Sequence, residues 1–335
     1  MKLSFDQLKS IIQGAAYLSE EENGLQPHRF NKEEEAYYCA TTHAKKAFSS
    51  ASVQAVFKTD ADKLILKANV STGSTRSYFS FDVYVNDVFT AEFKNFDHEK
   101  MTLPYTGAKC PLGDFSWELS MEKGEKTIRI VFPFSSKVII SEFTLENATF
   151  VEPVRRSKTM LMYGDSITHG YDALNPSRAY APQLAHALDA YVINKAIGGE
   201  IFQPELSAIK NDISPDYITV AYGTNDWSKC TEEVFLANCK GFYQNLKNNY
   251  PDARIFAITP IWREDMHKET AYGLFDDVRK AIHSICEEIG GITVIDGFNF
   301  VPQETELYAD LRLHPTNEGF DFYAKNLICE IKKHI

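Results

Sequence analysis

Apolar and polar residues alternate through much of the first half of the chain, from about residue 50 to 150. Residues 79–85 place an apolar side chain at every second position, and residues 117–121 repeat this pattern. A period of two puts alternate side chains on one face, which is typical of a half-buried strand. Asn86-Asp87 supplies a turn after the first of these strands. Because no long helix interrupts them, the strands predict an antiparallel β-sandwich or jelly roll.

After Pro153 short apolar runs alternate with helical stripes. The apolar runs cover residues 160–163, 191–193, 217–222, 255–258 and 292–295. The amphipathic stripes predict helices over residues 180–188, 235–250, 274–289 and 320–331. Strands that alternate with helices predict a parallel sheet covered by helices on both faces. We therefore expect two domains: an accessory β-sandwich over residues 1–152 and a three-layer α/β domain with a five-stranded parallel sheet over residues 153–335.

The first fifty residues carry a weaker pattern. Leu8, Ile11 and Ile12 indicate a short helix, and residues 20–24 indicate a loop. The run Glu33-Glu34-Glu35 is interpreted as a solvated face, because carboxylates are seldom fully buried without a partner.

Charge and composition exclude several classes of protein. The 335 residues carry a formal net charge of -11 and no long run of Lys or Arg, so we expect neither nucleic acid nor an anionic membrane as a partner. No apolar stretch is long enough for a membrane span, and Asp6 and Lys9 interrupt any signal-peptide core, so a cytoplasmic location is expected. The six cysteines form no C-x-x-C pair and the histidines have no ligand spacing, so no metal is expected.

A candidate nucleophile follows the first apolar run of the α/β half, in Gly164-Asp165-Ser166. A serine there lies at the carboxyl end of a strand, where glycine permits a tight turn and backbone N–H groups point at the group under attack. The alternative is an ordinary strand-to-helix turn capped by Asp or Ser.

Three further polar motifs lie at equivalent places in the chain. Gly198-Gly199 follows the second strand, where a backbone N–H can approach an anion closely. Asn225 follows the third strand, and its side chain can donate to a developing oxyanion. His314 precedes the last helix, next to Pro315. Taken singly, each has a structural alternative, since Gly-Gly and Asn-Asp pairs make turns and a lone histidine is usually structural.

Together the four motifs resemble the SGNH, or GDSL-like, hydrolase superfamily, over roughly residues 159–335. The resemblance implies a flavodoxin-like fold and a serine esterase that needs no cofactor. It implies that Ser166 is the nucleophile and His314 the general base. It also implies an oxyanion hole made by the N–H groups of Ser166 and Gly199 and by the side chain of Asn225.

One position departs from the family pattern. The superfamily usually has an aspartate three residues before the histidine, but here that position is Leu311 and Asp310 stands four before. A small adjustment of the loop would bring the Asp310 carboxylate to the imidazole and complete a triad. Alternatively, a backbone carbonyl holds His314 and a Ser–His dyad operates.

An antiparallel sandwich ahead of an SGNH domain resembles a two-domain subgroup of esterases, some of which remove acetyl groups from carbohydrates. We expect hydrolysis of short acyl esters, because no long apolar lid accompanies the motifs. The alternatives are an acyltransferase with the same site and a catalytically silent carbohydrate-binding protein. Trp227, Trp262 and Arg263 follow the third and fourth strands and are candidates for substrate contacts. The oligomeric state is left open.

Overall fold

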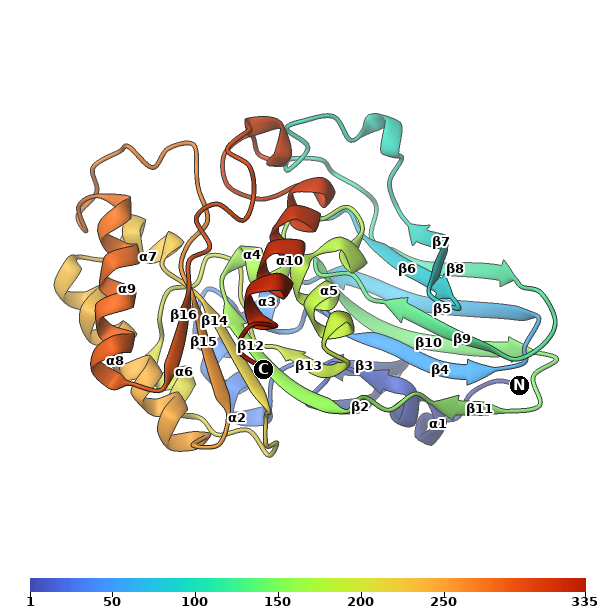
Figure 1. Cartoon of the computed structure of the whole chain (residues 1–335). Coiled ribbons are helices and arrows are strands. Elements are labelled where there is room, and N and C mark those ends of the chain that lie inside the picture. The colour runs from blue at the N-terminus through green and yellow to red at the C-terminus, as the bar shows by residue number, and fades with distance from the viewer.

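Two antiparallel sheets from the first half of the chain stack face to face in the computed structural model, which describes all residues 1–335 (Figure 1). One sheet has the order β1 (Ile12–Gln13), β4 (Gln54–Thr59), β9 (Lys126–Val131), β6 (Ser80–Val85) and β7 (Val88–Lys94), with β11 (Val151–Pro153) paired to β4. The other has the order β2 (Tyr17–Glu21), β3 (Gly24–His28), β10 (Ser136–Glu146), β5 (Lys63–Thr72) and β8 (Gly113–Ser120). The predicted sandwich is confirmed.

The alternation along these strands explains the sandwich. In β5, Leu64, Leu66 and Ala68 are buried while the residues between them are partly exposed. Leu66 lies opposite Phe143 on one neighbouring strand and Trp117 on the other. Cross-strand pairs of large apolar side chains fill the space between the sheets, because all of them point to the same face.

The second half of the chain forms a parallel sheet. Its strands are β13 (Ala190–Asn194), β12 (Lys158–Gly164), β14 (Tyr217–Ala221), β15 (Arg254–Ile258) and β16 (Ile292–Ile295), in this order. Numbered within the domain, the order is 2-1-3-4-5, which is that of flavodoxin-like folds. The five predicted strands and the α/β fold are therefore confirmed. In such sheets ligands bind at the carboxyl ends of the strands, where the strand order reverses.

Helices cover both faces of the parallel sheet (Figure 1). The helices of the chain are α1 (Phe5–Ile11), α2 (Lys32–Cys39), α3 (Ala44–Ala47), α4 (Ser166–His169), α5 (Tyr180–Ala187), α6 (Pro204–Ala208), α7 (Thr224–Lys229), α8 (Glu232–Asn249), α9 (Phe275–Ile289) and α10 (Asn317–Ile331). Short 3₁₀ turns are η1 (His98–Lys100), η2 (Pro176–Arg178) and η3 (Thr305–Leu307). Buried side chains of α6, α8 and α9 share one core and those of α5 and α10 share another. No helix has both the length and the apolar composition that a membrane crossing requires.

The loop expected over residues 20–24 is shorter in the structure: β2 extends to Glu21 and β3 begins at Gly24, so Glu22 and Asn23 form a hairpin turn. One expectation about the N-terminal segment is wrong. The glutamate run is not a solvated face: Glu34 is fully buried and its carboxylate lies 2.5 Å from the ammonium of Lys195. Glu34 and Lys195 can both be buried because each neutralises the other. They lie in different elements, so the sequence around Glu34 alone does not reveal the pair.

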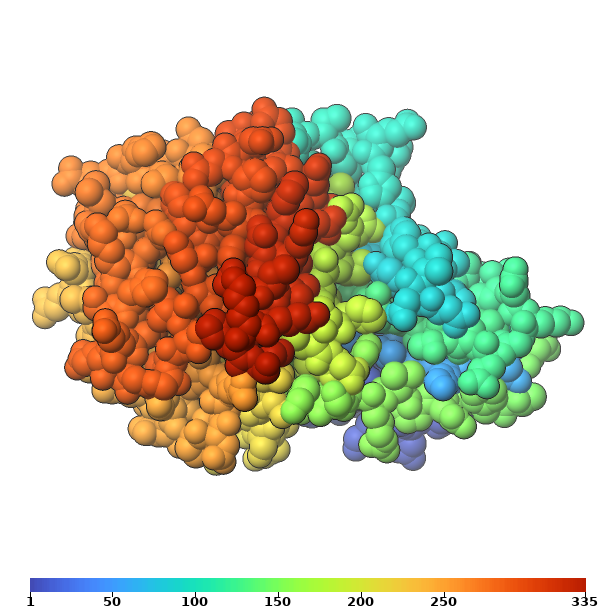
Figure 2. Space-filling view, viewed as in Figure 1, coloured from blue at the N-terminus to red at the C-terminus, as the bar shows by residue number.

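The segment around α2 and α3 joins the two halves of the molecule. Phe30, Tyr38 and Ala47 belong to the same apolar core as α8 and α9, although they precede most of the sandwich in sequence. The antiparallel strands end with β11, close to the boundary placed after residue 152, and that boundary stays a prediction. In the space-filling view the atoms of the two halves lie directly against each other (Figure 2). Packing across the boundary therefore brings sandwich residues close to the α/β domain.

Candidate active site

The structure places Ser166 at the carboxyl end of β12, as the first residue of α4 (Figure 1). The side chain of Asp165 caps this helix by accepting a hydrogen bond from the N–H of Ile167 at 2.9 Å. Gly164 permits the turn, since a Cβ there would lie 2.9 Å from the Ala221 carbonyl oxygen and still closer to Thr168. The turn therefore presents the hydroxyl of Ser166 at the edge of the sheet where the other motifs also end.

His314 contacts both Ser166 and Asp310. The Nε2 atom of His314 lies 2.8 Å from Ser166 Oγ, and Nδ1 lies 2.9 Å from Asp310 Oδ2. Leu311 adopts a left-handed conformation with φ of 58°, which turns the loop and brings an aspartate four residues back to the imidazole. The three side chains thus form one continuous hydrogen-bonded chain, with the Asp in the displaced position.

Asp310 is held in place by its own loop. Its Oδ1 atom accepts the backbone N–H groups of Arg312, Leu313 and His314 at 2.7–3.0 Å. Burial by itself would raise the pKa of Asp310, but the hydrogen bond and charge of His314 and these N–H donors hold it well below its usual range. The carboxylate is therefore ionised and oriented toward Nδ1 of His314.

A second carboxylate lies behind His314, and the sequence analysis missed it. Asp172 is fully buried, and its Oδ2 atom lies 3.4 Å from His314 Nδ1. Arg76 donates two hydrogen bonds to Asp172, at 2.6 and 2.9 Å, and the hydroxyl of Tyr78 donates another. Arg76 and Tyr78 come from the sandwich, between β5 and β6, so no local motif near Ser166 signals this contact.

The Gly198–Gly199 loop is held from several sides. Gly199 has a φ of 87°, which favours glycine, and the ammonium groups of Lys46 and Lys229 donate to the carbonyls of Gly198 and Gly199. Asn225 Nδ2 donates to the Glu200 carbonyl at 3.0 Å. An Asn amide has two protons, so this contact fixes the side chain while leaving a donor for a ligand.

His169 also holds the Gly198–Gly199 loop in place. It is buried, and burial lowers its pKa well below the usual range, so the imidazole is neutral. Its Nδ1 atom accepts the N–H of Gly198 at 3.2 Å, which leaves the proton on Nε2 to be donated to the Phe134 carbonyl at 3.0 Å. The histidine nearest Ser166 in sequence therefore positions the glycine loop and does not contact the serine hydroxyl.

Three buried carboxyl groups are next in sequence to the three residues of the candidate oxyanion hole. Burial raises the pKa of Asp165 to about 6, that of Asp226 to about 7 and that of Glu200 to about 8. Asp226 accepts the N–H groups of Phe202 and Gly223, each at 3.0 Å. Glu200 accepts only the hydroxyl of Tyr38, at 2.9 Å, and its Oε1 atom has no partner. A proton on Glu200 at neutral pH removes a negative charge that would oppose a developing oxyanion.

We predict that Glu200→Gln raises the melting temperature at pH 8 by more than it does at pH 5. A carboxyl with a raised pKa binds its proton more tightly in the folded state, so the free energy of unfolding falls as the pH rises from about 4.5 to about 8. Glutamine is neutral throughout and avoids this loss. Thermal unfolding of both proteins across this range is the measurement. A melting-temperature difference that does not change with pH would contradict the assignment.

Two candidates for substrate contacts are wrong. Trp227 is 1% exposed, its Nε1 donates to the Gly273 carbonyl at 3.0 Å, and the Arg263 guanidinium covers its ring at 4.6 Å. Arg263 is also buried and pairs with Asp265 at 2.6 Å. Neither side chain is accessible to a ligand, because the two are buried and pack against each other. Trp262 is half-buried and stays a prediction.

No group of three or more His, Cys, Asp or Glu side chains is arranged to hold a metal ion. A serine hydroxyl beside an imidazole, with a carboxylate on the far nitrogen, is the arrangement that activates serine as a nucleophile. A backbone N–H and an amide side chain are donors of the kind that stabilise the negative charge formed during acyl transfer.

Residues 162–322 match the model of the GDSL-like Lipase/Acylhydrolase family. This match and the five-stranded parallel sheet place the second half of the chain in the class of SGNH-type acyl hydrolases. Comparison with curated proteins finds no significant match.

Solved structures share the fold over the whole chain. The salicylyl-acyltransferase SsfX3 from a tetracycline biosynthetic pathway has a TM-score of 0.83 at 20% identity, covering 99% of this chain and 97% of its own. A family two carbohydrate esterase from Clostridium thermocellum, solved with cellohexaose, has a TM-score of 0.69 at 16% identity, covering 96% and 98%. An acetyl xylan esterase from the rumen bacterium Butyrivibrio proteoclasticus has a TM-score of 0.64 at 16% identity, covering 99% and 97%. At these identities the likeness is one of fold.

Proposed function

We propose that the protein is a serine esterase that hydrolyses short acyl esters, acetyl esters above all, of a carbohydrate or a related metabolite. The observation that carries the proposal is the hydrogen-bonded chain from Ser166 through His314 to Asp310, with contacts of 2.8 and 2.9 Å. This chain needs no further group to move the serine proton, so no cofactor is invoked.

In the proposed reaction Ser166 Oγ attacks the ester carbonyl and its proton passes to His314 Nε2. The carbonyl oxygen becomes an oxyanion that the N–H groups of Ser166 and Gly199 and the side chain of Asn225 stabilise. The intermediate then collapses, the alcohol leaves with the proton from His314, and the acyl group stays on Ser166. A water molecule, deprotonated by His314, releases the carboxylic acid in the second half-reaction and restores the serine.

Asp310 is assigned the positioning of His314 in this reaction. Its carboxylate accepts the Nδ1 proton, which fixes the tautomer with a free Nε2 lone pair. It also stabilises the imidazolium that forms when the serine proton arrives. The depressed pKa of Asp310 supports the assignment, because an ionised carboxylate is the form that both tasks require.

The sandwich is proposed to support the site. Arg76 neutralises Asp172 behind His314, Tyr78 donates a hydrogen bond to the same carboxylate, and Lys46 donates to the Gly198 carbonyl. These contacts favour a two-domain enzyme, with an accessory domain over residues 1–152 and a catalytic domain over residues 153–335. Removal of the first domain would expose the supports of both the histidine and the glycine loop.

A carbohydrate substrate is supported by the fold as a whole. The structures described as a family two carbohydrate esterase and an acetyl xylan esterase cover nearly the whole of this chain, including the sandwich. Because both domains are shared with these structures, we propose a substrate of the same class, an ester of a carbohydrate.

An acyltransferase is the second candidate function. The structure of a salicylyl-acyltransferase covers 99% of this chain at a TM-score of 0.83. The same residues would form the acyl-enzyme, and an alcohol would replace water in the second half-reaction. Product analysis with a large excess of a sugar acceptor distinguishes the two: free carboxylic acid indicates hydrolysis, and a new ester indicates transfer.

Esterase activity is tested first with p-nitrophenyl acetate, butyrate and octanoate, and then with acetylated sugars. We expect kcat/KM to fall with chain length and acetate to be released from at least one acetylated sugar. A preference for octanoate would contradict the short-acyl assignment. Sugar binding without turnover of any ester would instead favour a carbohydrate-binding protein.

We predict that Asn225→Ala lowers kcat by about 10²–10³-fold with little change in KM, because the amide acts mainly on the transition state. Steady-state kinetics with p-nitrophenyl acetate provide the measurement. Asn326→Ala is a matched control on α10, where the amide only donates to the Phe300 carbonyl. A rise in KM at unchanged kcat would make Asn225 a substrate-binding residue.

A further inference from the structure

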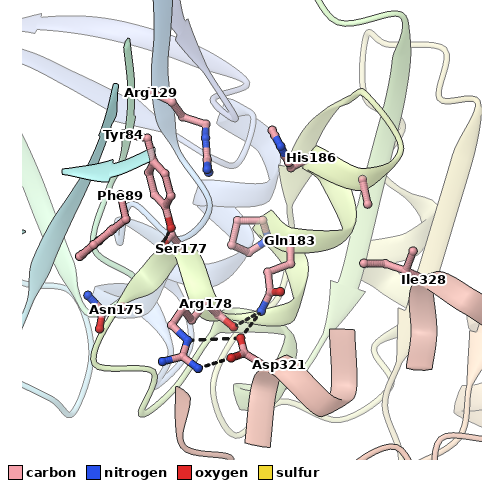
Figure 3. A pocket seen from close by; sticks show the side chains of 12 residues that line it. Tyr84, Phe89, Arg129, Asn175, Ser177, Arg178, Gln183, His186, Asp321 and Ile328 are labelled. Carbon is pink, nitrogen blue, oxygen red and sulfur yellow. Dashed lines mark hydrogen bonds and ion pairs between the residues drawn. The ribbon is translucent and has the colours of Figure 1, made fainter. Parts of the chain in front are cut away.

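A cavity of about 570 Å³ lies between the sandwich and the α/β domain (Figure 3). Strands β6, β7 and β9 form one wall, and η2, α5 and α10 form the other. None of Ser166, His314 and Asp310 lines it, so the cavity is separate from the candidate active site. A volume of this size accommodates a ligand as large as a sugar.

Arg129 of β9 points into this cavity (Figure 3). The residue is only 8% exposed, its Nε atom has no hydrogen-bond partner, and no carboxylate oxygen lies within 4.0 Å of its guanidinium. The guanidinium lies over the ring of Tyr84, at 3.9 Å from the ring centroid. Burial lowers the pKa of Arg129, because its charge is removed from water without a paired anion.

The other polar groups of the cavity already have partners in the protein. Arg178 pairs with Asp321, and Gln183 donates to both the Asp321 carboxylate and the Arg178 carbonyl (Figure 3). The hydroxyl of Tyr84 lies 2.9 Å from that of Ser177.

At the rim, His186 lies 4.0 Å from a carboxylate oxygen of Asp87. The paired charges of Arg178 and Asp321 cancel, so Arg129 carries the charge in the cavity that still lacks a counterion. The chain has a net charge of -11 and therefore more carboxylates than cations, yet none of them pairs with Arg129. A buried cation without a partner is costly, so an anionic ligand would stabilise it.

We propose that this interdomain cavity binds a small organic anion, with a carboxylate or phosphate group on Arg129 and the body of the ligand against Tyr84 and Phe89. A guanidinium presents parallel N–H donors that match the oxygens of either group. The aromatic side chains supply the apolar surface on which a sugar-sized body packs. The proposal does not depend on esterase activity.

The test is calorimetric titration of the native full-length protein with D-glucuronate, D-glucose 6-phosphate and inorganic phosphate, with D-glucose as the neutral control. We expect at least one of the two sugar anions to bind at least tenfold more tightly than glucose. The stronger of the two identifies carboxylate or phosphate as the preferred group. Prior labelling of the active-site serine with a fluorophosphonate should leave this binding unchanged, which separates the cavity from the esterase site.

Two variants locate the binding group. Arg129→Gln should weaken anion binding at least tenfold. Arg156→Gln removes the same charge from a neighbouring arginine that pairs with Asp189 and does not line the cavity, and it should change the affinity less than twofold. Circular dichroism melting confirms that each variant is folded. Equal affinity for glucose and both sugar anions in the native protein, or anion binding that survives Arg129→Gln, would overturn the proposal.

Discussion

Replacing Ser166 with alanine is expected to lower kcat by roughly 10³-fold or more and to abolish labelling by a fluorophosphonate probe. The hydroxyl lies 2.8 Å from His314 Nε2 and at the carboxyl end of β12, and no other group in this arrangement is a nucleophile of the same kind. Without the hydroxyl the acyl-enzyme cannot form, so only slow attack by water remains. The measurements are steady-state hydrolysis of p-nitrophenyl acetate and gel detection of the probe.

Ser141→Ala is the matched control for this experiment. Ser141 is an exposed serine on β10 of the sandwich with no hydrogen bond to Ser166, His314 or Asp310, and its removal should affect neither kcat nor labelling. Labelling that persists in Ser166→Ala would remove Ser166 from its proposed role and direct attention to another side chain.

Replacing Asp310 with asparagine is expected to lower kcat on the order of 10³–10⁴-fold. The Oδ1 atom that accepts three backbone N–H groups is retained in asparagine, so the loop keeps its shape. The amide nitrogen then faces His314 Nδ1 and donates to it, which places the imidazole proton on Nε2. An imidazole in that tautomer cannot accept the proton of Ser166. The loss is therefore expected in kcat, with the melting temperature nearly unchanged.

Asp172→Asn is the informative comparison, because Asp172 Oδ2 lies 3.4 Å from the same nitrogen of His314. Arg76 and Tyr78 already occupy this carboxylate, so we expect its loss to lower kcat less than about tenfold. A small effect of Asp310→Asn would contradict the triad. If Asp172→Asn then had the large effect, Asp172 would be the residue that orients His314. If both effects were small, a Ser–His dyad would remain.

The sequence by itself determined the two kinds of fold and the order of the motifs. A period of two before residue 150, and short apolar runs with helical stripes after Pro153, are properties of each element alone. Because every strand of a parallel sheet ends at the same edge, motifs that follow strands are predicted to meet there. Ser166 and His314 could be chosen for this reason, together with the resemblance to a family.

Only the tertiary structure decided which distant groups are partners. Asp310 reaches His314 because Leu311 adopts a left-handed conformation. Such a conformation is usually signalled by glycine, and a leucine at this position gives no sign of it. Asp172 meets Arg76 across 96 positions of sequence, and Glu34 meets Lys195 across 161. Periodicity reports which face of an element is apolar, but a buried charge is stable only through a partner brought by another element. The burial of Trp227 likewise depends on how α7 packs, so its position beside a motif could not show whether a substrate reaches it.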